Sequence, residues 1–408
     1  MIGSVLLLYN APADSLPVLF TNAVSTNNSE QIYKLIHKLI EIADENNYSE
    51  GNLWQNFLTH FILSNENVFS LACERKKINE CSLKFLALND FALFMKIFHL
   101  HHDNMKIIEN FIGSNETHSI ICEYSKLLAS CKTPEEFYEY VTDFYRDYGV
   151  GMFAFNKAFR LSSSNNRLIP VQNKNVGTMR LNDLVGYEIQ KGELISNTEA
   201  FLSGKPANNV LLYGDGGTGK STSVKALLNE YYSKGLRVIE IYKHQFKEIL
   251  KLTETLRRRN YKFIIFIDDL SFEEDESDYK YLKAVIEGGI EARPENILIY
   301  ATSNRRHIIR EVWSDRDDME HNGDIHRSDT VEEKLSLVSR FGIAINYSSP
   351  TRKMYHEIVL TLAKKSGLKI DEEKLLSGAD RWELRHGGMT GRAARQYIDY
   401  LLSTSDNF

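Results

Sequence analysis

Cysteine is scarce in this sequence of 408 residues, and zinc-binding spacings are missing. The four cysteines all fall in the first third of the chain, at Cys73, Cys81, Cys122 and Cys131, and no two of them form a C-x-x-C pair. A structural zinc site is therefore not expected. We predict reduced, buried thiols, as is usual in a cytosolic protein.

The sequence also lacks a long, uncharged hydrophobic run. The first apolar stretch, Val5 to Tyr9, has no basic residues before it and is too short for a signal peptide or a membrane span. No later stretch is long and uncharged enough to cross a bilayer. We therefore expect a soluble, cytoplasmic protein without a membrane partner.

An excess of positive charge is missing as well, because the formal net charge is -6 at pH 7. This balance argues against a protein that binds nucleic acid non-specifically through Lys and Arg. The net charge does not decide whether the surface has a local basic patch. Arg257, Arg258 and Arg259 form one basic run, and residues 75–77 form another. Each run is either a solvated helix end or a patch that faces nucleic acid.

Residues 1–177 are predicted to form a mostly α-helical domain of unknown role. Apolar residues recur at helical spacing behind capping residues such as Asn28 and Thr133. The many aromatic residues share this spacing, which favours packing between helices over a surface that stacks bases. The histidines at residues 99–102 lack a third ligand at a matching spacing, so a solvated helix end is favoured over a metal site. A polar stretch at residues 162–177 is interpreted as the domain boundary.

A phosphate-binding loop is the feature around which the rest of the chain is organised. The apolar run Val210–Tyr213 indicates a buried strand, and the next residues, GDGGTGKS, match G-x-x-x-x-G-K-[ST] at every fixed position. Helical apolar spacing follows, so a glycine-rich turn that binds nothing is disfavoured. Such a loop and helix N-terminus direct amides at phosphate oxygens. The predicted ligand-binding residues are Gly214, Asp215, Gly216, Gly217, Thr218, Gly219, Lys220, Ser221 and Thr222.

The region from about residue 181 to 347 is predicted to be the nucleotide-binding domain, an αβα sandwich with a parallel sheet. Apolar strands at 237–241, 262–269 and 297–301 alternate with helical stretches, a pattern typical of doubly wound α/β folds. Ligands bind at the carboxyl ends of the strands in such sheets. Asp268 and Asn304 both follow strand ends, as Gly214 does.

Two carboxylates, Asp268 and Asp269, supply the expected chemistry. Lys220 should reach the β- and γ-phosphates, while Ser221 and Asp268 should hold Mg²⁺. Asp269 is then the residue that orients or deprotonates the attacking water. The alternative is that the two aspartates only cap the next helix, and Glu273 and Glu274 are nearby substitutes for Asp269.

These motifs resemble the core of AAA+ ATPases. The P-loop, FIDD at 266–269, SNRR at 303–306 and SRFG at 339–342 occur in the order and roughly the spacing of that superfamily. The combination of DDLSFE, SNRRH and VEEKLSLVSRFG further resembles an uncharacterised bacterial family of predicted AAA+ ATPases, known only as a domain of unknown function. The resemblance covers about residues 181–402.

The resemblance implies two further catalytic residues. Asn304 matches sensor 1, which polarises the attacking water or reads the γ-phosphate, and the alternative is a simple turn residue. Arg340 matches the arginine finger, which acts in trans in a neighbouring subunit of a homo-oligomer. The alternative for Arg340 is a surface salt bridge to Glu332 or Glu333.

The resemblance also implies a lid and an adenine-binding turn. Residues 348–408 read as three helices, and Arg392 on the last one matches sensor 2, which touches the phosphates of its own subunit; Arg395 is its rival. Leu184 and Val185 match the hydrophobic turn that folds around the adenine. The preference for adenine rests on the resemblance alone.

Two departures from the AAA+ pattern bear on function. Asp269 replaces the glutamate that is usual in hydrolytic members, which leaves the speed of turnover open. Residues 242–261 contain no aromatic–aliphatic–glycine pore loop, which favours a loader-like or switch-like ATPase over an unfoldase. The predicted function is hydrolysis of Mg²⁺-bound ATP to ADP and phosphate that drives conformational change in an oligomer or partner. A slow nucleotide-dependent switch and a helicase-loader-like, nucleic-acid-associated ATPase are the alternatives.

Overall fold

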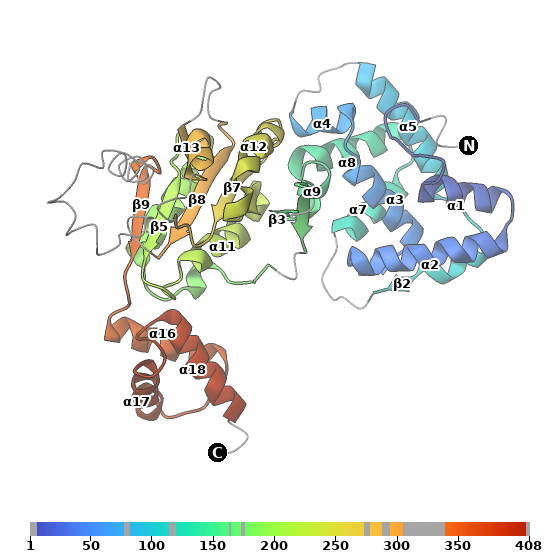
Figure 1. Cartoon of the computed structure of the whole chain (residues 1–408). Coiled ribbons are helices and arrows are strands. Elements are labelled where there is room, and N and C mark those ends of the chain that lie inside the picture. The colour runs from blue at the N-terminus through green and yellow to red at the C-terminus, as the bar shows by residue number, and fades with distance from the viewer. Residues whose placement is uncertain are drawn as a thin grey trace. The chain divides into compact units, whose positions relative to one another are not determined.

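The computed structural model describes residues 6–76, 82–113, 120–162, 165–172, 176–272, 278–287, 294–304 and 339–404. The chain divides into two compact units, Met1–Phe155 and Asn156–Phe408, and both can be followed by colour in Figure 1. The first unit is built from helices, and the second contains the large sheet.

The first unit consists of helices and a two-stranded antiparallel ribbon, β1 (Glu50–Gly51) with β2 (Phe111–Ile112). The described α-helices are α1 (Leu16–Ser25), α2 (Ser29–Glu45), α3 (Leu53–Ser64), α4 (Val68–Glu74), α5 (Ser82–Phe98), α6 (Lys106–Glu109), α7 (Ile120–Ser130), α8 (Pro134–Asp147) and α9 (Met152–Phe155). The side chains of Asn28 and Thr133 accept hydrogen bonds from the first turns of α2 and α8, as predicted.

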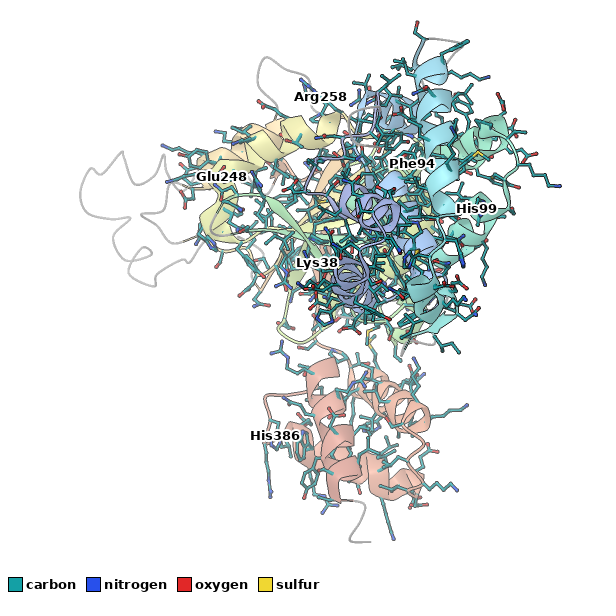
Figure 2. The ribbon with its side chains drawn as sticks, turned by 90° about the vertical axis from the view of Figure 1, so that its right-hand side faces the viewer. Lys38, Phe94, His99, Glu248, Arg258 and His386 are labelled. Carbon is teal, nitrogen blue, oxygen red and sulfur yellow. The ribbon has the colours of Figure 1, made fainter. Side chains whose placement is uncertain are left out.

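Aromatic side chains form much of the core of this unit. Trp54 is fully buried and stacks on Phe20, and its indole N–H donates to the carbonyl of Ile97 at 2.7 Å. Phe94 of α5 is buried as well, whereas His99, just beyond the end of α5, is exposed (Figure 2). The prediction that these aromatics pack between helices is therefore confirmed.

The thiols described by the structure are also in this unit. Cys73, Cys122 and Cys131 are buried and form no disulfide, and Cys81 lies outside the described residues. Within the described part of the chain, no group of three or more His, Cys, Asp or Glu side chains is arranged to hold a metal ion. The helices described there include none that is both long and apolar enough to cross a membrane.

The second unit is organised by a seven-stranded sheet in the order β4-β3-β6-β7-β8-β5-β9. All neighbours are parallel except β3 and β4, so the predicted α/β sandwich with a mostly parallel sheet is confirmed. The strands are β3 (Ala158–Leu161), β4 (Leu168–Val171), β5 (Val210–Gly214), β6 (Leu236–Glu240), β7 (Lys262–Ile267), β8 (Ile297–Ser303) and β9 (Ile343–Tyr347). The helices that accompany them are α10 (Glu188–Leu202), α11 (Lys220–Tyr231), α12 (Ile249–Arg257) and α13 (Tyr279–Glu287).

The central strands are apolar on both faces because helices cover both (Figure 1). Ile264 and Tyr300 belong to one hydrophobic cluster with residues of α10 and α11. Ile265 and Ile299, which are the sequence neighbours of Ile264 and Tyr300, point to the opposite face and are also buried. The parallel pairing of β5 and β7 with β8 brings the carboxyl ends of these three strands to one edge of the sheet.

The predicted boundary at residue 177 is wrong. β3 pairs in parallel with β6 and antiparallel with β4, and the Ser162 amide, just after β3, donates to the carbonyl of Arg167, just before β4, at 2.8 Å. Ala158–Leu161 and Leu168–Val171 therefore belong to the sheet. The division between the two units falls between Phe155 and Asn156 instead.

Three C-terminal helices follow the sheet and share a hydrophobic cluster of their own. They are α16 (Arg352–Lys365), α17 (Glu372–Glu383) and α18 (Gly391–Thr404). Thr351 and Asp371 cap the first two, and the Thr390 hydroxyl accepts from the amide of Ala393 at 3.0 Å at the start of the third.

Candidate nucleotide-binding site

The loop between β5 and α11 curls at the carboxyl edge of the sheet. Gly214 has φ of +128°, and a Cβ atom there would lie 2.3 Å from the carbonyl oxygen of Tyr347. No other residue fits this close approach of two strands. The Asp215 amide donates to the same carbonyl at 3.1 Å, which fixes the start of the loop against β9.

The loop also contains several backbone N–H groups that have no hydrogen-bond acceptor among the described residues. Among the described residues, none accepts a hydrogen bond from the backbone N–H groups between Gly216 and Thr222. These groups include the first turn of α11, whose dipole favours negative charge. The donor set therefore fits a polyphosphate, which carries many acceptor oxygens and no donors.

Lys220 lies at the centre of the site. Its Nζ donates to the carbonyls of Gly214 and Asp215 at 2.8 and 2.6 Å and to Oδ1 of Asn304 at 3.1 Å. Burial lowers the pKa of Lys220 below its usual value, while nearby carboxylates, above all Asp215, oppose this shift. A buried ammonium in this setting would gain from an added anion.

The predicted metal ligands are in contact. Ser221 Oγ donates to Oδ1 of Asp268 at 2.5 Å. The hydroxyl of Thr302, near the end of β8, donates to the same Oδ1 at 2.6 Å. A serine hydroxyl beside a carboxylate is a suitable oxygen set for Mg²⁺, which prefers few protein ligands and retained waters.

Asp269 and Asn304 form a second pair in the same place. Asn304 Nδ2 donates to Oδ1 of Asp269 at 2.9 Å. Asp269 has φ of +54°, a left-handed conformation that aspartate tolerates better than most residues. Lys220, Asn304 and Asp269 thus form one hydrogen-bonded chain across the ends of β5, β8 and β7.

The start of α18, the last of the C-terminal helices, lies beside the loop between β5 and α11. A Cβ atom built on Gly217 would lie 3.2 Å from the Cβ atoms of Arg392 and Thr390. The charge of Arg392 contributes to the lowered pKa of Lys220, although less than burial does. Arg392 therefore lies beside this loop, and its role as sensor 2 stays a prediction.

The turn at residues 184–187 lies between the loop and the lid. A Cβ atom on Gly219 would contact Leu184 at 3.4 Å, and one on Gly186 would lie 2.7 Å from the sulfur of Met354 in α16. Val185 packs against the hydrophobic cluster of the lid helices. This turn therefore touches both parts that would enclose a base.

The side chain of Asp215, in the loop between β5 and α11, contacts the segment that connects β9 to α16. Its Oδ2 accepts from the amide and the hydroxyl of Ser349, both at 2.7 Å. These two bonds hold the pKa of Asp215 below its usual value. The Tyr187 hydroxyl donates to the carbonyl of the preceding residue, Ser348, at 2.9 Å. The segment that leads into α16 is thus tied to the loop and to the start of α10.

A family model described as "Protein of unknown function (DUF815)" matches residues 154–405, which is more than half of the chain. The chain belongs to the DUF815 family. The match confirms the predicted resemblance to a family of unknown function, and it begins next to the boundary between the two units. The helical unit before residue 154 lies outside it.

Solved structures similar to this DUF815 member include RuvB, the Holliday junction branch migration motor of Thermotoga maritima, with 18% identity and a TM-score of 0.39. The match covers 56% of this chain and 65% of that motor. A mutant of the same protein matches with 17% identity, the same two coverages and a TM-score of 0.39. No curated protein matches the chain.

Arg340 is not part of this site. It precedes β9, whose first residue pairs with Val210 at the start of β5, so Arg340 lies at the edge of the sheet opposite the phosphate-binding loop. Its predicted partners Glu332 and Glu333 lie outside the described residues. The substitutes for Asp269 at residues 273 and 274 lie outside them as well.

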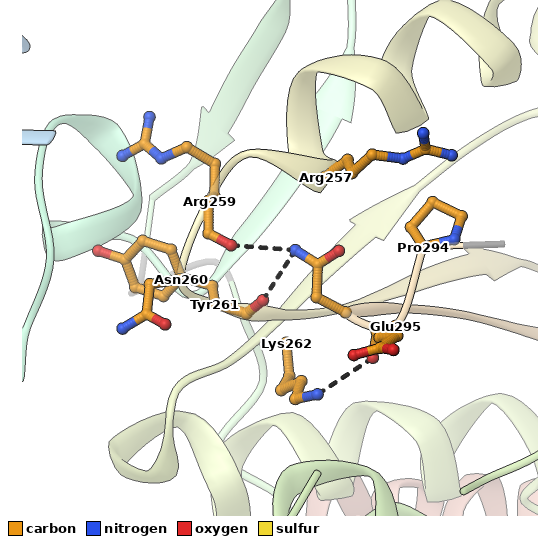
Figure 3. A pocket seen from close by; sticks show the side chains of 8 residues that line it. Arg257, Arg259, Asn260, Tyr261, Lys262, Pro294 and Glu295 are labelled. Carbon is orange, nitrogen blue, oxygen red and sulfur yellow. Dashed lines mark hydrogen bonds between the residues drawn. The ribbon is translucent and has the colours of Figure 1, made fainter. Parts of the chain in front are cut away.

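The basic run of this DUF815 member lies at that opposite edge too. Arg257, Arg259, Lys262 and Glu295 are among the residues that line a hollow of about 460 Å³ (Figure 3). Lys262 Nζ donates to the carbonyl of Glu295 at 3.1 Å. Arg258 is exposed beyond the last residue of α12 (Figure 2).

Three residues of the site were not predicted from the sequence: Thr302, Ser349 and Thr390. Thr302 could have been noticed as a hydroxyl two positions before Asn304, at the end of an apolar strand. Ser349 and Thr390 reach the loop only through the placement of the lid, for which the sequence carries no local signal.

Replacing Arg392 with alanine should lower ATP affinity, whereas Arg395→Ala should not. Both side chains are exposed on α18, but only Arg392 lies beside Gly217. Loss of a charge-assisted bond to phosphate corresponds to about a 10-fold rise in Kd. Calorimetric titration of both variants with ATP checks this, and equal affinities for the two would remove the sensor-2 assignment.

Proposed function

We propose that this protein is an ATPase that binds Mg²⁺-bound ATP and hydrolyses it to ADP and phosphate, driving conformational change in an oligomer. One observation carries the proposal. Unpaired amides, a buried ammonium, the Ser221–Asp268 pair and the Asp269–Asn304 pair converge at one edge of the sheet.

The phosphoryl chemistry needs mainly positioning and charge neutralisation. The loop amides and Lys220 bind the β- and γ-phosphates, and Arg392 adds charge from the lid. Asp269, oriented by Asn304, accepts a proton from the water that attacks the γ-phosphorus. The bond from that phosphorus to the β–γ bridging oxygen breaks, and ADP leaves with the electron pair.

Ser221 and Asp268 would hold Mg²⁺ in this proposal. A bound Mg²⁺ supplies charge neutralisation on the phosphate oxygens. Their mutual contact at 2.5 Å supports this role, because one hydroxyl and one carboxylate oxygen already meet where the loop ends.

The location of Arg340 supports a role in trans. It lies at the edge of the sheet opposite its own phosphate-binding loop, so it is suited to the site of a neighbouring copy and not to its own. A homo-oligomer in which the arginine finger of one subunit completes the next site is therefore proposed.

The direct test measures phosphate release with Mg²⁺ and ATP, together with particle mass by light scattering with and without ATP. Turnover accompanied by ATP-dependent assembly is the expected result. A folded protein without measurable affinity for Mg²⁺-bound ATP would overturn the proposal.

A slow nucleotide-dependent switch is the second candidate, and the ties between loop and lid favour it. The Asp215–Ser349 bonds and the Gly217–Arg392 contact link the phosphate-binding loop directly to the C-terminal helices. Nucleotide binding could therefore move the lid without rapid hydrolysis. Assembly with ATP at a negligible rate of phosphate release would support this candidate.

A helicase-loader-like role is the third candidate and rests on the basic hollow at Arg257 and Arg259. Adding single-stranded DNA to the phosphate-release assay tests it. Stimulation of the rate, lost at high salt, would favour it over the other two.

A further inference from the structure

The hydroxyl of Thr302 bonds to both Asp268 and Asp269. It donates to Oδ1 of Asp268 at 2.6 Å and accepts from the backbone amide of Asp269 at 2.9 Å. Thr302 itself is 2% exposed, so water does not compete for these bonds. Because the hydroxyl accepts from an amide, its own proton is directed to the Asp268 carboxylate.

We propose that Thr302 is a positioning residue that sets Asp268 for the metal and Asp269 for the attacking water at the same time. The inference rests on the proposed function, because it concerns the same site. Thr302 touches neither the nucleotide nor the metal in this proposal; it acts through the two aspartates.

The bond to Asp268 orients its carboxylate. Oδ1 accepts from both Thr302 and Ser221, whereas Oδ2 accepts no hydrogen bond from any described residue. A carboxylate held through one oxygen keeps the other available to the hydration shell of a cation. Such outer bonds to metal-binding carboxylates influence metal affinity.

The bond to Asp269 holds its backbone. Asp269 has a left-handed φ of +54°, which costs conformational energy in an L-residue. Two hydrogen bonds to β8 offset that cost: the Asp269 amide donates to the Thr302 hydroxyl at 2.9 Å, and the Leu270 amide donates to the Thr302 carbonyl at 2.7 Å. In this conformation the Asp269 carboxylate reaches Asn304.

The test replaces Thr302 with valine, which removes the hydroxyl and keeps the branched shape. We expect the Mg²⁺ concentration that half-saturates ATP binding to rise about 10-fold, and kcat to fall by about 10-fold or more. ATP affinity measured by calorimetry without Mg²⁺ should stay unchanged, because the loop amides and Lys220 are intact. Thr302→Ser keeps the hydroxyl and should restore both values. If Thr302→Val does not fold, Thr302→Ala asks the same question.

Thr198→Val is the matched control. Thr198 is also fully buried, and its hydroxyl bonds to the carbonyl of Leu194 at 2.8 Å and the hydroxyl of Tyr300 at 2.9 Å, away from the site. This variant should lower the thermal midpoint without changing the response to Mg²⁺.

Two outcomes would overturn the inference, and they are distinguishable. If Thr302→Val loses thermal stability like Thr198→Val but keeps the wild-type response to Mg²⁺, the role of Thr302 is structural and the proposed function stands. If the wild-type protein itself does not bind ATP with Mg²⁺, the proposed function fails and takes the inference with it.

Discussion

Replacing Lys220 with alanine is expected to reduce affinity for Mg²⁺-bound ATP about 100-fold or more. The ammonium is buried and donates to the carbonyls of Gly214 and Asp215 and to Oδ1 of Asn304, so it lies within the loop whose amides have no acceptor among the described residues. Charge-assisted hydrogen bonds to two phosphates each contribute about 1.5–3 kcal/mol. Calorimetric titration with ATP and Mg²⁺ measures the change.

The expected stability of this variant makes the result easy to interpret. Burial lowers the pKa of Lys220, so the folded protein bears a desolvation cost for this charge when nothing binds beside it. We therefore expect little loss in the thermal midpoint of Lys220→Ala. Lys225→Ala, on the exposed side of the same helix α11, is the control and should bind ATP like the wild type. Wild-type affinity in Lys220→Ala would refute the assignment of the loop.

The phosphate-binding loop could be predicted from the sequence because its chemistry is local. Gly214 must be glycine where its backbone touches Tyr347, and the apolar run before it must be a buried strand. The same holds for helix starts, since Thr133, Thr351 and Asp371 satisfy amides of their own first turns.

The extent of the sheet could not be predicted because it depends on partners far away in the chain. β3 alternates a buried Phe159 and Leu161 with an exposed Arg160, and the hairpin partner β4 is largely exposed. Two such short strands, of which β4 lies at the edge of the sheet, carry little apolar signal, and the polar sequence between them resembles a linker. Only the pairing of β3 with β6 shows where they belong.

The same distinction applies to the site. Asp268, Asp269 and Asn304 follow strand ends, so a parallel sheet alone predicts that they meet. The hydrogen bonds that orient them depend on side-chain direction and strand register, as with Thr302, which stands opposite Leu212 of β5. The ties through Ser349 depend on where the lid packs.

Replacing Asp269 with asparagine should leave binding of Mg²⁺-bound ATP intact and lower phosphate release about 100-fold or more. An amide cannot accept the proton of the attacking water, whereas it can still bond to Asn304. The fold should also persist, because asparagine tolerates the left-handed backbone at this position at least as well as aspartate. Single-turnover phosphate release, measured beside equilibrium binding, separates the two effects.

Asp268→Asn supplies the contrast, since it should weaken Mg²⁺-dependent binding itself. Asp399→Asn, on the exposed surface of α18, controls for the loss of one negative charge and should match the wild type. A wild-type rate in Asp269→Asn would show that another group accepts the proton. The role of Asp269 would then be structural: its carboxylate would hold Asn304, the predicted sensor 1, through their hydrogen bond and would not activate the attacking water. The slow switch would be favoured only if the wild-type protein assembles with ATP at a negligible rate of phosphate release.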